Sequence, residues 1–327
     1  MSAVLDQSTG MFLAGMRALG GPPFHEQSVA DIRAGVAMAS LQLAPPRTEV
    51  HSAVDRRIPN ATGEVGVRIY TPRPLAAGEA LPIVLHFHGG GFIAGSVDTH
   101  DAIARHLSVH ADAIVIGVDY RLAPEHPFPA AVDDAYGALS WAAGHAAEIG
   151  GDPARVAVAG DSAGGNLAAV LCHLTKERGG PAIAFQALIY PVVDFDLSTP
   201  RTSMAQFGGG DYFLSIHDME MFRSHYFTDV PGQMRDPRAS PLVAEDCSGL
   251  PAALVITSGC DPLRDEGKAY ADRLAAASVP VDYHCIEGTI HACMSFGAAI
   301  PAGVEALAFV AGRLRAALHQ GASGPRR

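Results

Sequence analysis

Cysteine is scarce in this sequence and follows no pattern. The chain of 327 residues holds five cysteines, an odd number, and none of them are spaced as Cys-x-x-Cys. This spacing excludes the usual thiolate sites for zinc and offers no framework of disulfides. We therefore expect reduced thiols, as in a cytoplasmic protein, and no bound metal.

Charge is sparse as well. Charged residues make up 17% of the chain, and the formal net charge is −11. No cluster of Lys and Arg is present that would neutralise phosphates, so nucleic acid is not expected as a partner. No apolar run approaches the length of about 18 residues that a membrane span needs. Residues 11–19 are apolar but interrupted by Arg17, which favours an amphipathic helix over a signal peptide.

What the sequence does contain is a long alternation of strand and helix patterns. Apolar residues make up 48% of the chain, enough for a sizeable core in one large domain or two smaller ones. Strands that alternate with long helices predict parallel βαβ units in a doubly wound sheet, whereas the alternating pattern of residues 65–69 predicts an antiparallel strand. The expected buried strands are residues 81–87, 113–118, 156–159, 184–189, 253–257 and 281–286, and the helices between them include residues 99–111, 131–147 and 302–318.

Two segments interrupt this alternation. Residues 1–45 are helical in character, with apolar residues such as Leu13, Met16 and Leu19 at helical spacing. Residues 193–239 hold glycines and scattered aromatics but no strand pattern. We predict that the two segments form a helical cap over the strand ends of a domain made of residues 46–192 and 240–319. Residues 320–327 are polar and are expected to form a loose tail.

The stretch GDSAG at positions 160–164 joins a predicted strand to a predicted helix. Ser162 lies at its apex, and Gly160 and Gly164 leave no side chains to crowd the turn. Such a sharp turn imposes strained backbone geometry on the central serine and exposes its hydroxyl at the edge of the sheet. Because a glycine-rich turn can open any helix, the prediction depends on partners elsewhere in the chain.

A nucleophilic serine needs a base, and the base needs an acid to orient it. In the order Ser…Asp/Glu…His, both partners follow the serine and lie at strand ends. Asp261 follows the strand 253–257, with Asp265 as a second candidate one turn into the next helix. His291 lies in the loop after the strand 281–286, whereas His284 lies inside that strand and His319 near the end of the chain. Singly, Asp261 could be a helix cap and His291 an ordinary loop histidine, but together with the serine they predict a catalytic triad.

A glycine-rich loop, HGGG at positions 88–91, follows the strand 81–87. Glycines let backbone N–H groups face a substrate oxygen without obstruction from side chains. We expect the N–H groups of Gly90, Gly91 and Ala163, the residue after the serine, to form an oxyanion hole. His88 and Gly89 are expected to support this loop, although a plain flexible loop is the alternative.

Four motifs together resemble the hormone-sensitive-lipase-like esterases of the α/β-hydrolase superfamily. They are HGGGF at 88–92, YRLAPEHPFPA at 120–130, GDSAGGN at 160–166 and DPLRDEG at 261–267. The resemblance covers nearly the whole chain. It implies an α/β-hydrolase fold with a mostly parallel sheet, a two-part helical cap, serine carboxylesterase activity and no cofactor. It also implies the triad Ser162, Asp261 and His291.

The chain departs from this family at two places near the predicted triad. The family usually has Gly-Phe after the histidine, where this chain has Ala292 and Cys293, and commonly has Tyr before the acid, where this chain has Cys260. We expect these changes to alter the local shape of the pocket and to leave two thiols near the site.

The leading functional hypothesis is hydrolysis of short- to medium-chain carboxylic esters through an acyl-serine intermediate. The alternatives are hydrolysis of amides, lactones or carbamates on the same triad, and a non-catalytic small-molecule receptor, because fold alone does not decide function. His291 argues against a receptor, since receptors that resemble this family have lost the catalytic histidine. The expected partner is a small-molecule ester, and a homodimer is the expected alternative to a monomer.

Overall fold

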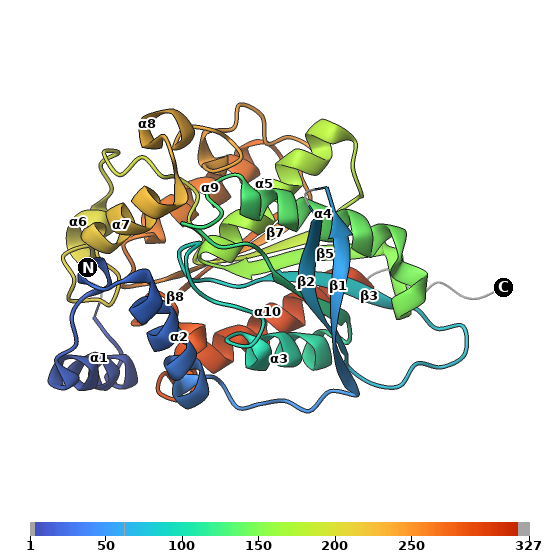
Figure 1. Ribbon diagram of the computed structural model, residues 1–327, viewed down its shortest axis with the longest axis horizontal. Coiled ribbons are helices and arrows are strands. Elements are labelled where there is room, and N and C mark those ends of the chain that lie inside the picture. The colour runs from blue at the N-terminus through green and yellow to red at the C-terminus, as the bar shows by residue number, and fades with distance from the viewer. Residues whose placement is uncertain (1–3, 62, 320–327) are drawn as a thin grey trace.

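An eight-stranded, mostly parallel sheet forms the centre of the molecule (Figure 1). The computed structural model describes residues 4–61 and 63–319, so the tail predicted at residues 320–327 lies outside the described residues. The strand order is β1-β2-β4-β3-β5-β6-β7-β8. The pairs β1–β2 and β2–β4 are antiparallel and the others are parallel, which confirms the predicted mostly parallel sheet.

The central strands are buried because helices cover both faces of the sheet. In β3, for example, Ile83 and Leu85 face one apolar core and Val84 faces the other, as the alternation of side chains along a strand requires. The strands are β1 (Ser52–Asn60), β2 (Gly63–Thr71), β3 (Leu81–Phe87), β4 (Ile114–Asp119), β5 (Gly151–Asp161), β6 (Phe185–Ile189), β7 (Ala252–Ser258) and β8 (Val281–Ile286).

Helices α4, α5 and α9 lie on one face of the sheet, and α3 and α10 lie on the other (Figure 1). Within the described ranges, no helix is both long and apolar enough to cross a membrane. The helices are α1 (Gln7–Leu19), α2 (Val29–Leu43), α3 (Asp101–Ala111), α4 (Ala130–Gly144), α5 (Ala163–Arg178), α6 (Thr202–Phe207), α7 (Ile216–Tyr226), α8 (Val230–Gln233), α9 (Arg264–Ala276) and α10 (Pro301–His319).

Two predicted helices have different ends in the structure. The helix predicted over residues 99–111 begins at Asp101, because Ser96 and Thr99 bond to each other in a turn, with Ser96 N–H donating to the Thr99 hydroxyl at 2.9 Å. The helix predicted over residues 131–147 ends at Gly144, and a short 3-10 helix, Ala146–Ile149, continues the chain.

The two segments outside the alternation lie together at one end of the sheet, with α1 and α2 below α6 and α7 in Figure 1. The N-terminal segment is fastened at both ends, since Asp6 N–H donates to the Gly288 carbonyl at 2.9 Å and Ala298 N–H donates to the Leu43 carbonyl at 3.0 Å. In its middle, His25 Nδ1 lies 2.8 Å from Oδ1 of the buried Asp218 on α7.

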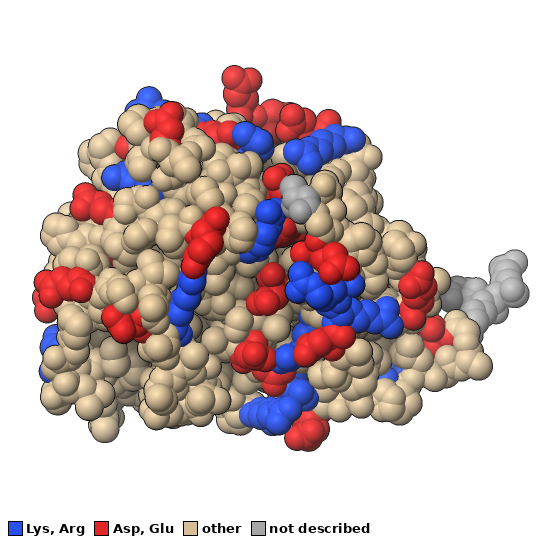
Figure 2. Space-filling view, viewed as in Figure 1, with Lys and Arg blue, Asp and Glu red and all other residues tan. Residues whose placement is uncertain are grey.

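The apolar residues of α1 and α2 do not all face the core. Leu13 and Ile32 are buried, but Leu19 is 85% exposed and Leu41 is 84% exposed. Figure 2 shows few charged side chains over these two helices, whereas charges of both signs gather over β1 and β2. The surface around α1 and α2 is therefore largely apolar and uncharged.

Candidate active site

Ser162 lies between β5 and α5 in a strained backbone conformation. Its φ is 55° and its ψ is −116°, a region that non-glycine residues seldom adopt. Its N–H donates to the Ile189 carbonyl at 2.9 Å. A Cβ at Gly164 would overlap the carbonyl oxygen of Phe87, and one at Gly160 would overlap the carbonyl of Gly164. The two glycines are thus required by close packing, and they leave the serine at the edge of the sheet.

Ser162, His291 and Asp261 form a continuous chain of hydrogen bonds. Nε2 of His291 lies 2.9 Å from Oγ of Ser162, and Nδ1 lies 2.7 Å from Oδ2 of Asp261. With the proton on Nδ1, the imidazole donates to the carboxylate and accepts from the serine hydroxyl. The second carboxylate oxygen accepts from Leu263 N–H at 2.8 Å. All three side chains are buried, so water competes little for these bonds.

The other candidates for acid and base lie elsewhere. Oδ2 of Asp265 accepts from Ser203 N–H at 2.7 Å. His284 is exposed on β8, and Nε2 of His319 lies 3.2 Å from the Ala111 carbonyl at the end of α3. The structure therefore brings one aspartate and one histidine to the serine. Asp261 also serves the local turn, because its other oxygen binds a backbone N–H.

The glycines after β3 form a tight loop beside the serine. The N–H of Gly89 donates to Oδ1 of Asp161 at 3.1 Å. Gly90 and Gly91 have positive φ angles of 123° and 61°, which glycine adopts without strain. Within the described residues, no acceptor takes the N–H of Gly90, Gly91 or Ala163. Three N–H groups are thus available to a ligand, while that of Gly89 is used inside the protein.

His88 supports this loop through contacts with Tyr120 and Gly89. Its ring stacks on Tyr120 with centroids 4.2 Å apart, and the Tyr120 hydroxyl donates to the His88 carbonyl at 2.7 Å. Its Nδ1 lies 2.8 Å from the Gly89 carbonyl. Burial lowers the pKa of His88 to about 3, so the imidazole is neutral near pH 7 and donates to that carbonyl.

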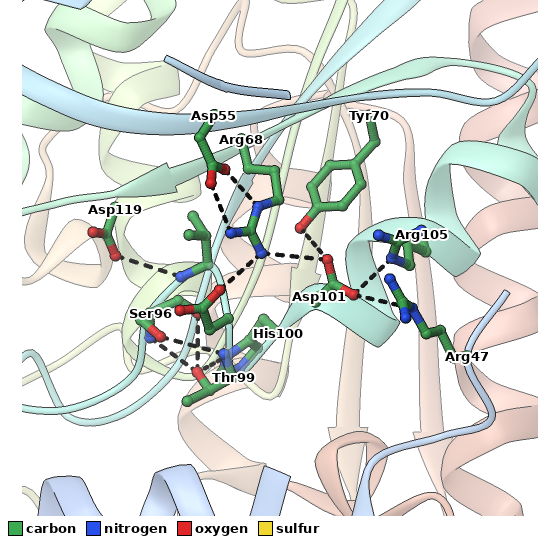
Figure 3. Close-up of polar contacts among 12 residues, drawn as sticks. Arg47, Asp55, Arg68, Tyr70, Ser96, Thr99, His100, Asp101, Arg105 and Asp119 are labelled. Carbon is green, nitrogen blue, oxygen red and sulfur yellow. Dashed lines mark hydrogen bonds and ion pairs between the residues drawn. The ribbon is translucent and has the colours of Figure 1, made fainter. Parts of the chain in front are cut away.

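At the start of α3, His100 belongs to a polar cluster (Figure 3). Its Nε2 lies 3.3 Å from the nitrogen of Gly89 and 3.4 Å from Oδ1 of Asp161, and its Nδ1 lies 2.9 Å from the Thr99 hydroxyl. In the cluster, Arg68 pairs with Asp55 at 2.6 Å, Asp98 at 2.8 Å and Asp101 at 3.5 Å. These ion pairs fix the first turn of α3 and, with it, the adjacent imidazole.

The two thiols expected near the site do not line the cavity beside Ser162. Cys260 and Cys293 are completely buried, and burial raises the pKa of each thiol to about 11. Neither belongs to the residues that line the cavity. The departures from the family motif therefore place protonated thiols in the core behind the triad. In the described residues, no group of three or more His, Cys, Asp or Glu side chains is arranged to hold a metal ion.

A cavity of about 510 Å³ opens onto Ser162 and His291. Its volume falls within the range of roughly 300–1,000 Å³ that is usual for small-molecule sites. Residues of α1, α2, α7 and the glycine loop contribute to its wall. The wall is largely apolar, with Phe24, Phe213, Leu214, Met219, Phe222 and Phe296 among its members.

Sequence reasoning missed the residues that hold the glycine loop in place. Asp161 and Tyr120 lie inside the motifs GDSAGGN and YRLAPEHPFPA, so the sequence marks both residues, but it does not indicate that they hold the loop. His100 lies outside the motifs. Its contact with Gly89 depends on how β3 and α3 approach each other, which no local pattern specifies.

The fold, the strained serine and the glycine loop define a protein of the α/β-hydrolase class. A family profile described as alpha/beta hydrolase fold matches residues 84–295. The chain is 42% identical over 279 residues to the esterase LipI of Mycobacterium tuberculosis, across 84% of this chain and 86% of that protein. It is 38% identical over 293 residues to an ethyl acetate hydrolase of Pseudomonas putida, across 88% of this chain and 90% of that protein.

Among solved structures, an esterase of Pyrobaculum calidifontis matches with a TM-score of 0.87 and 39% identity, covering 95% of this chain and 98% of the other. The chain therefore belongs to the α/β-hydrolase family, and its resemblance to the hormone-sensitive-lipase-like carboxylesterases is confirmed.

Proposed function

We propose that this protein is a serine carboxylesterase that hydrolyses short- to medium-chain carboxylic esters. The observation that carries the proposal is the hydrogen-bonded chain from Ser162 through His291 to Asp261 at the floor of an apolar cavity. Relatives that share 38–42% of their residues with it across most of their length are named as ester hydrolases. The retained histidine favours this enzyme over a receptor.

In the proposed reaction, Oγ of Ser162 attacks the ester carbonyl as Nε2 of His291 takes the hydroxyl proton. The carbonyl oxygen becomes an oxyanion, and the N–H groups of Gly90, Gly91 and Ala163 stabilise its charge. The intermediate collapses when the C–O bond to the alcohol breaks and the imidazolium gives its proton to the leaving alkoxide.

Water then enters the site, and the same imidazole takes one of its protons as the hydroxide attacks the acyl-serine. Collapse of the second oxyanion releases the carboxylic acid and returns the proton to Ser162. Asp261 keeps the proton of His291 on Nδ1 and stabilises the imidazolium in both steps. Its second oxygen is held by Leu263 N–H, so the carboxylate cannot rotate away from the ring.

We also propose that residues 1–45 and 193–239 act as a two-part cap. Support comes from the described residues of both segments that line the cavity, such as Val36 on α2 and Leu214 before α7. An apolar wall of this kind favours the acyl chain of an ester over water.

We also propose a cytoplasmic location. Support comes from the five free cysteines, which are buried or half-buried.

The decisive test replaces the nucleophile. We expect Ser162→Ala to lower kcat for p-nitrophenyl butanoate by about 10⁴-fold or more, leaving residual turnover from the oxyanion donors. A fluorophosphonate probe should add the mass of one phosphonyl group to the native protein and nothing to this variant, as measured by intact mass spectrometry. Ser224→Ala, on the exposed side of α7, is the matched control and should behave as the native protein. Retention of most activity in a folded Ser162→Ala protein would contradict the mechanism.

A substrate panel separates the remaining alternatives. Butanoate esters, the matched butanamides and γ-lactones should be compared at equal concentration, and we expect kcat/KM to be highest for the esters. Higher kcat/KM for a lactone or an amide would assign the same triad to the other substrate class. Light scattering after size-exclusion chromatography distinguishes the monomer from the homodimer.

A further inference from the structure

Arg33 on α2 connects three segments that are distant in sequence. Its Nε donates to the Ile93 carbonyl at 2.7 Å. Its two terminal nitrogens each donate to one oxygen of Glu125 at 2.7 Å, and Nη2 also donates to the Ala123 carbonyl at 3.0 Å. The guanidinium therefore binds the N-terminal segment to the glycine loop and to the loop after β4.

Ile93 belongs to the turn that shapes the proposed oxyanion hole. The N–H groups of Ile93 and Ala94 donate to the Gly90 carbonyl at 3.2 Å and 3.0 Å. This turn fixes the peptide plane that follows Gly90 and carries the N–H of Gly91. Ala123 N–H donates to the Phe92 carbonyl at 2.9 Å. Arg33 thus binds a carbonyl on each of the two segments that the hydrogen bond from Ala123 to Phe92 joins, at Ile93 on one and at Ala123 on the other.

A second route from the N-terminal segment to the turn runs through α7. His25 is bonded to Asp218 of α7 through both its ring and its backbone N–H, at 2.8 Å and 3.0 Å. Phe222, one turn further along α7, packs so closely on Gly91 that a Cβ there would overlap its ring. Docking of the N-terminal segment therefore affects the position of Gly91 through two contacts, one from Arg33 to Ile93 and one from α7 through Phe222.

The geometry of Arg33 is more specific than a stabilising surface contact requires. Its side chain is 33% exposed and that of Glu125 is 55% exposed, and ion pairs this exposed contribute little to stability. The two parallel bonds to Glu125 fix the guanidinium plane and aim Nε at the Ile93 carbonyl. The hydrogen bond from Arg33 lowers the pKa of Glu125 to about 2, so the carboxylate stays charged at any pH at which the enzyme would be assayed.

We propose that Arg33 is a positioning residue for the oxyanion hole, through which the docking of α2 over the cavity sets the N–H groups of Gly90 and Gly91. The inference rests on the proposed esterase function. Arg33 does not line the cavity, so its removal should disturb the transition state more than the binding of substrate.

The test measures kcat and KM for p-nitrophenyl butanoate in Arg33→Met, Arg33→Lys and Glu125→Gln. We expect Arg33→Met to lower kcat about 10-fold with KM changed less than about threefold, because small displacements of oxyanion donors are costly. Lysine keeps the charge but lacks the fork, so Arg33→Lys should lose most of the same activity. Glu125→Gln removes one of the two carboxylate oxygens that orient the guanidinium, so it should lower kcat by a smaller factor.

Arg17→Met is the matched control. Arg17 also pairs the N-terminal segment with the segment 193–239, at 3.8 Å from Asp211, but it makes no ion pair or hydrogen bond to the glycine loop. It should keep the native kcat. A trifluoromethyl ketone, which forms an oxyanion on the serine, should lose affinity for Arg33→Met in parallel with kcat, whereas the matched methyl ketone should not.

Native kcat and native trifluoromethyl ketone affinity in folded Arg33→Lys would overturn the proposal, as would an equal loss in Arg17→Met. If Arg33→Met fails to fold, the lysine and Glu125→Gln variants decide the question. If the native protein itself does not hydrolyse esters or react with the probe, the proposed function fails instead, and the two failures are thereby distinguished.

Discussion

Ser162 is held by its neighbours in a conformation that it would not adopt by itself. Backbone strain of this kind amounts to about 1–3 kcal/mol and persists only where surrounding contacts impose it. Here the contacts are the N–H bond to Ile189 and the close approach of Gly160, Gly164 and Phe87. The motif GDSAG predicts this turn because its glycines are the residues that such packing requires.

The buried thiols give a prediction at the same scale. We expect at most Cys285, which is half-buried, to react with a thiol reagent at pH 8 in the native protein, and esterase activity to survive the treatment. Burial raises the pKa of Cys260 and Cys293 to about 11, so little of the reactive thiolate forms. Mass mapping of the modified residues gives the measurement, and denatured protein, in which all five thiols should react, is the control. Rapid labelling of Cys293 with loss of activity would show that the thiol faces the cavity.

Individual residues differ in how far the sequence could predict them. The positions of Ser162, Asp261 and His291 at strand ends predict that they meet, and the structure brings them together, although their catalytic roles stay predictions. Arg33 and His100 could not be found in this way. Each contacts a backbone group outside its own helix, at Gly89 for His100 and at Ile93 and Ala123 for Arg33, and these contacts depend on how the helices pack in the fold.

At the scale of elements, the junction of β5 and α5 depends on Gly164. A Cβ there would overlap the Phe87 carbonyl, and backbone atoms of a central strand cannot move aside. We expect Gly164→Ala to lower the free energy of unfolding by about 3 kcal/mol or more, measured by urea denaturation.

Gly312, exposed in the middle of α10 with open space around its Cβ position, is the matched control. Gly312→Ala should raise the free energy of unfolding by about 0.5–1 kcal/mol, because alanine loses less backbone entropy in a helix. Equal stability of the two variants would mean that the turn has room that the structure does not show.

The elements that sequence patterns described poorly are those that face solvent. In β1, Ile58 is the one buried residue, so the edge strand carries no alternation that would predict it. The apolar stripes of α1 and α2 predict helices that cover part of the molecule, and in the structure Leu13 and Ile32 are buried whereas Leu19 and Leu41 are exposed. Periodicity predicts that a helix has an apolar face, but not whether that face meets a core, a cavity or water. The central strands were predicted well because burial on both faces demands continuous apolar sequence.

At the scale of the whole molecule, buried histidines such as His86 and His88 contribute to the response to acid. Burial lowers the pKa of His86 to about 4 and that of His88 to about 3, from an ordinary value of 6.5. Below pH 6.5 the unfolded chain therefore binds protons that the folded chain does not, so stability falls as the pH is lowered. We expect each histidine to contribute a slope of up to about 1.4 kcal/mol per pH unit between pH 6.5 and about 4.

Urea denaturation at several pH values measures this slope. His86→Leu removes one of these groups. It should reduce the slope of the free energy of unfolding against pH by up to about 1.4 kcal/mol per pH unit, the equivalent of one proton. His51→Gln, at an exposed position, should leave it unchanged. An unaltered slope in folded His86→Leu would show that the buried imidazole is not the group that titrates.

The cavity leads to a prediction about acyl length. Each methylene buried in an apolar pocket contributes about 0.8 kcal/mol, close to fourfold in kcat/KM, until the wall is reached and further carbons force repacking. We expect kcat/KM to rise from acetate to about butanoate or hexanoate and then to fall, measured with p-nitrophenyl esters. A preference for emulsified long-chain triglycerides, with activation at the oil–water interface, would contradict the proposed substrate class.

The fastening of the N-terminal segment at Gly288 and Ala298 bears on the order in which the protein is made. α1 and α2 leave the ribosome long before Gly288 and Ala298, so these two anchors form only late in synthesis. His291 lies in the same late stretch of the chain. On the proposed mechanism, a nascent chain that stops before Gly288 holds the nucleophile but lacks its base. Such a chain would be inactive, so activity appears only after the segment that carries His291 has been made.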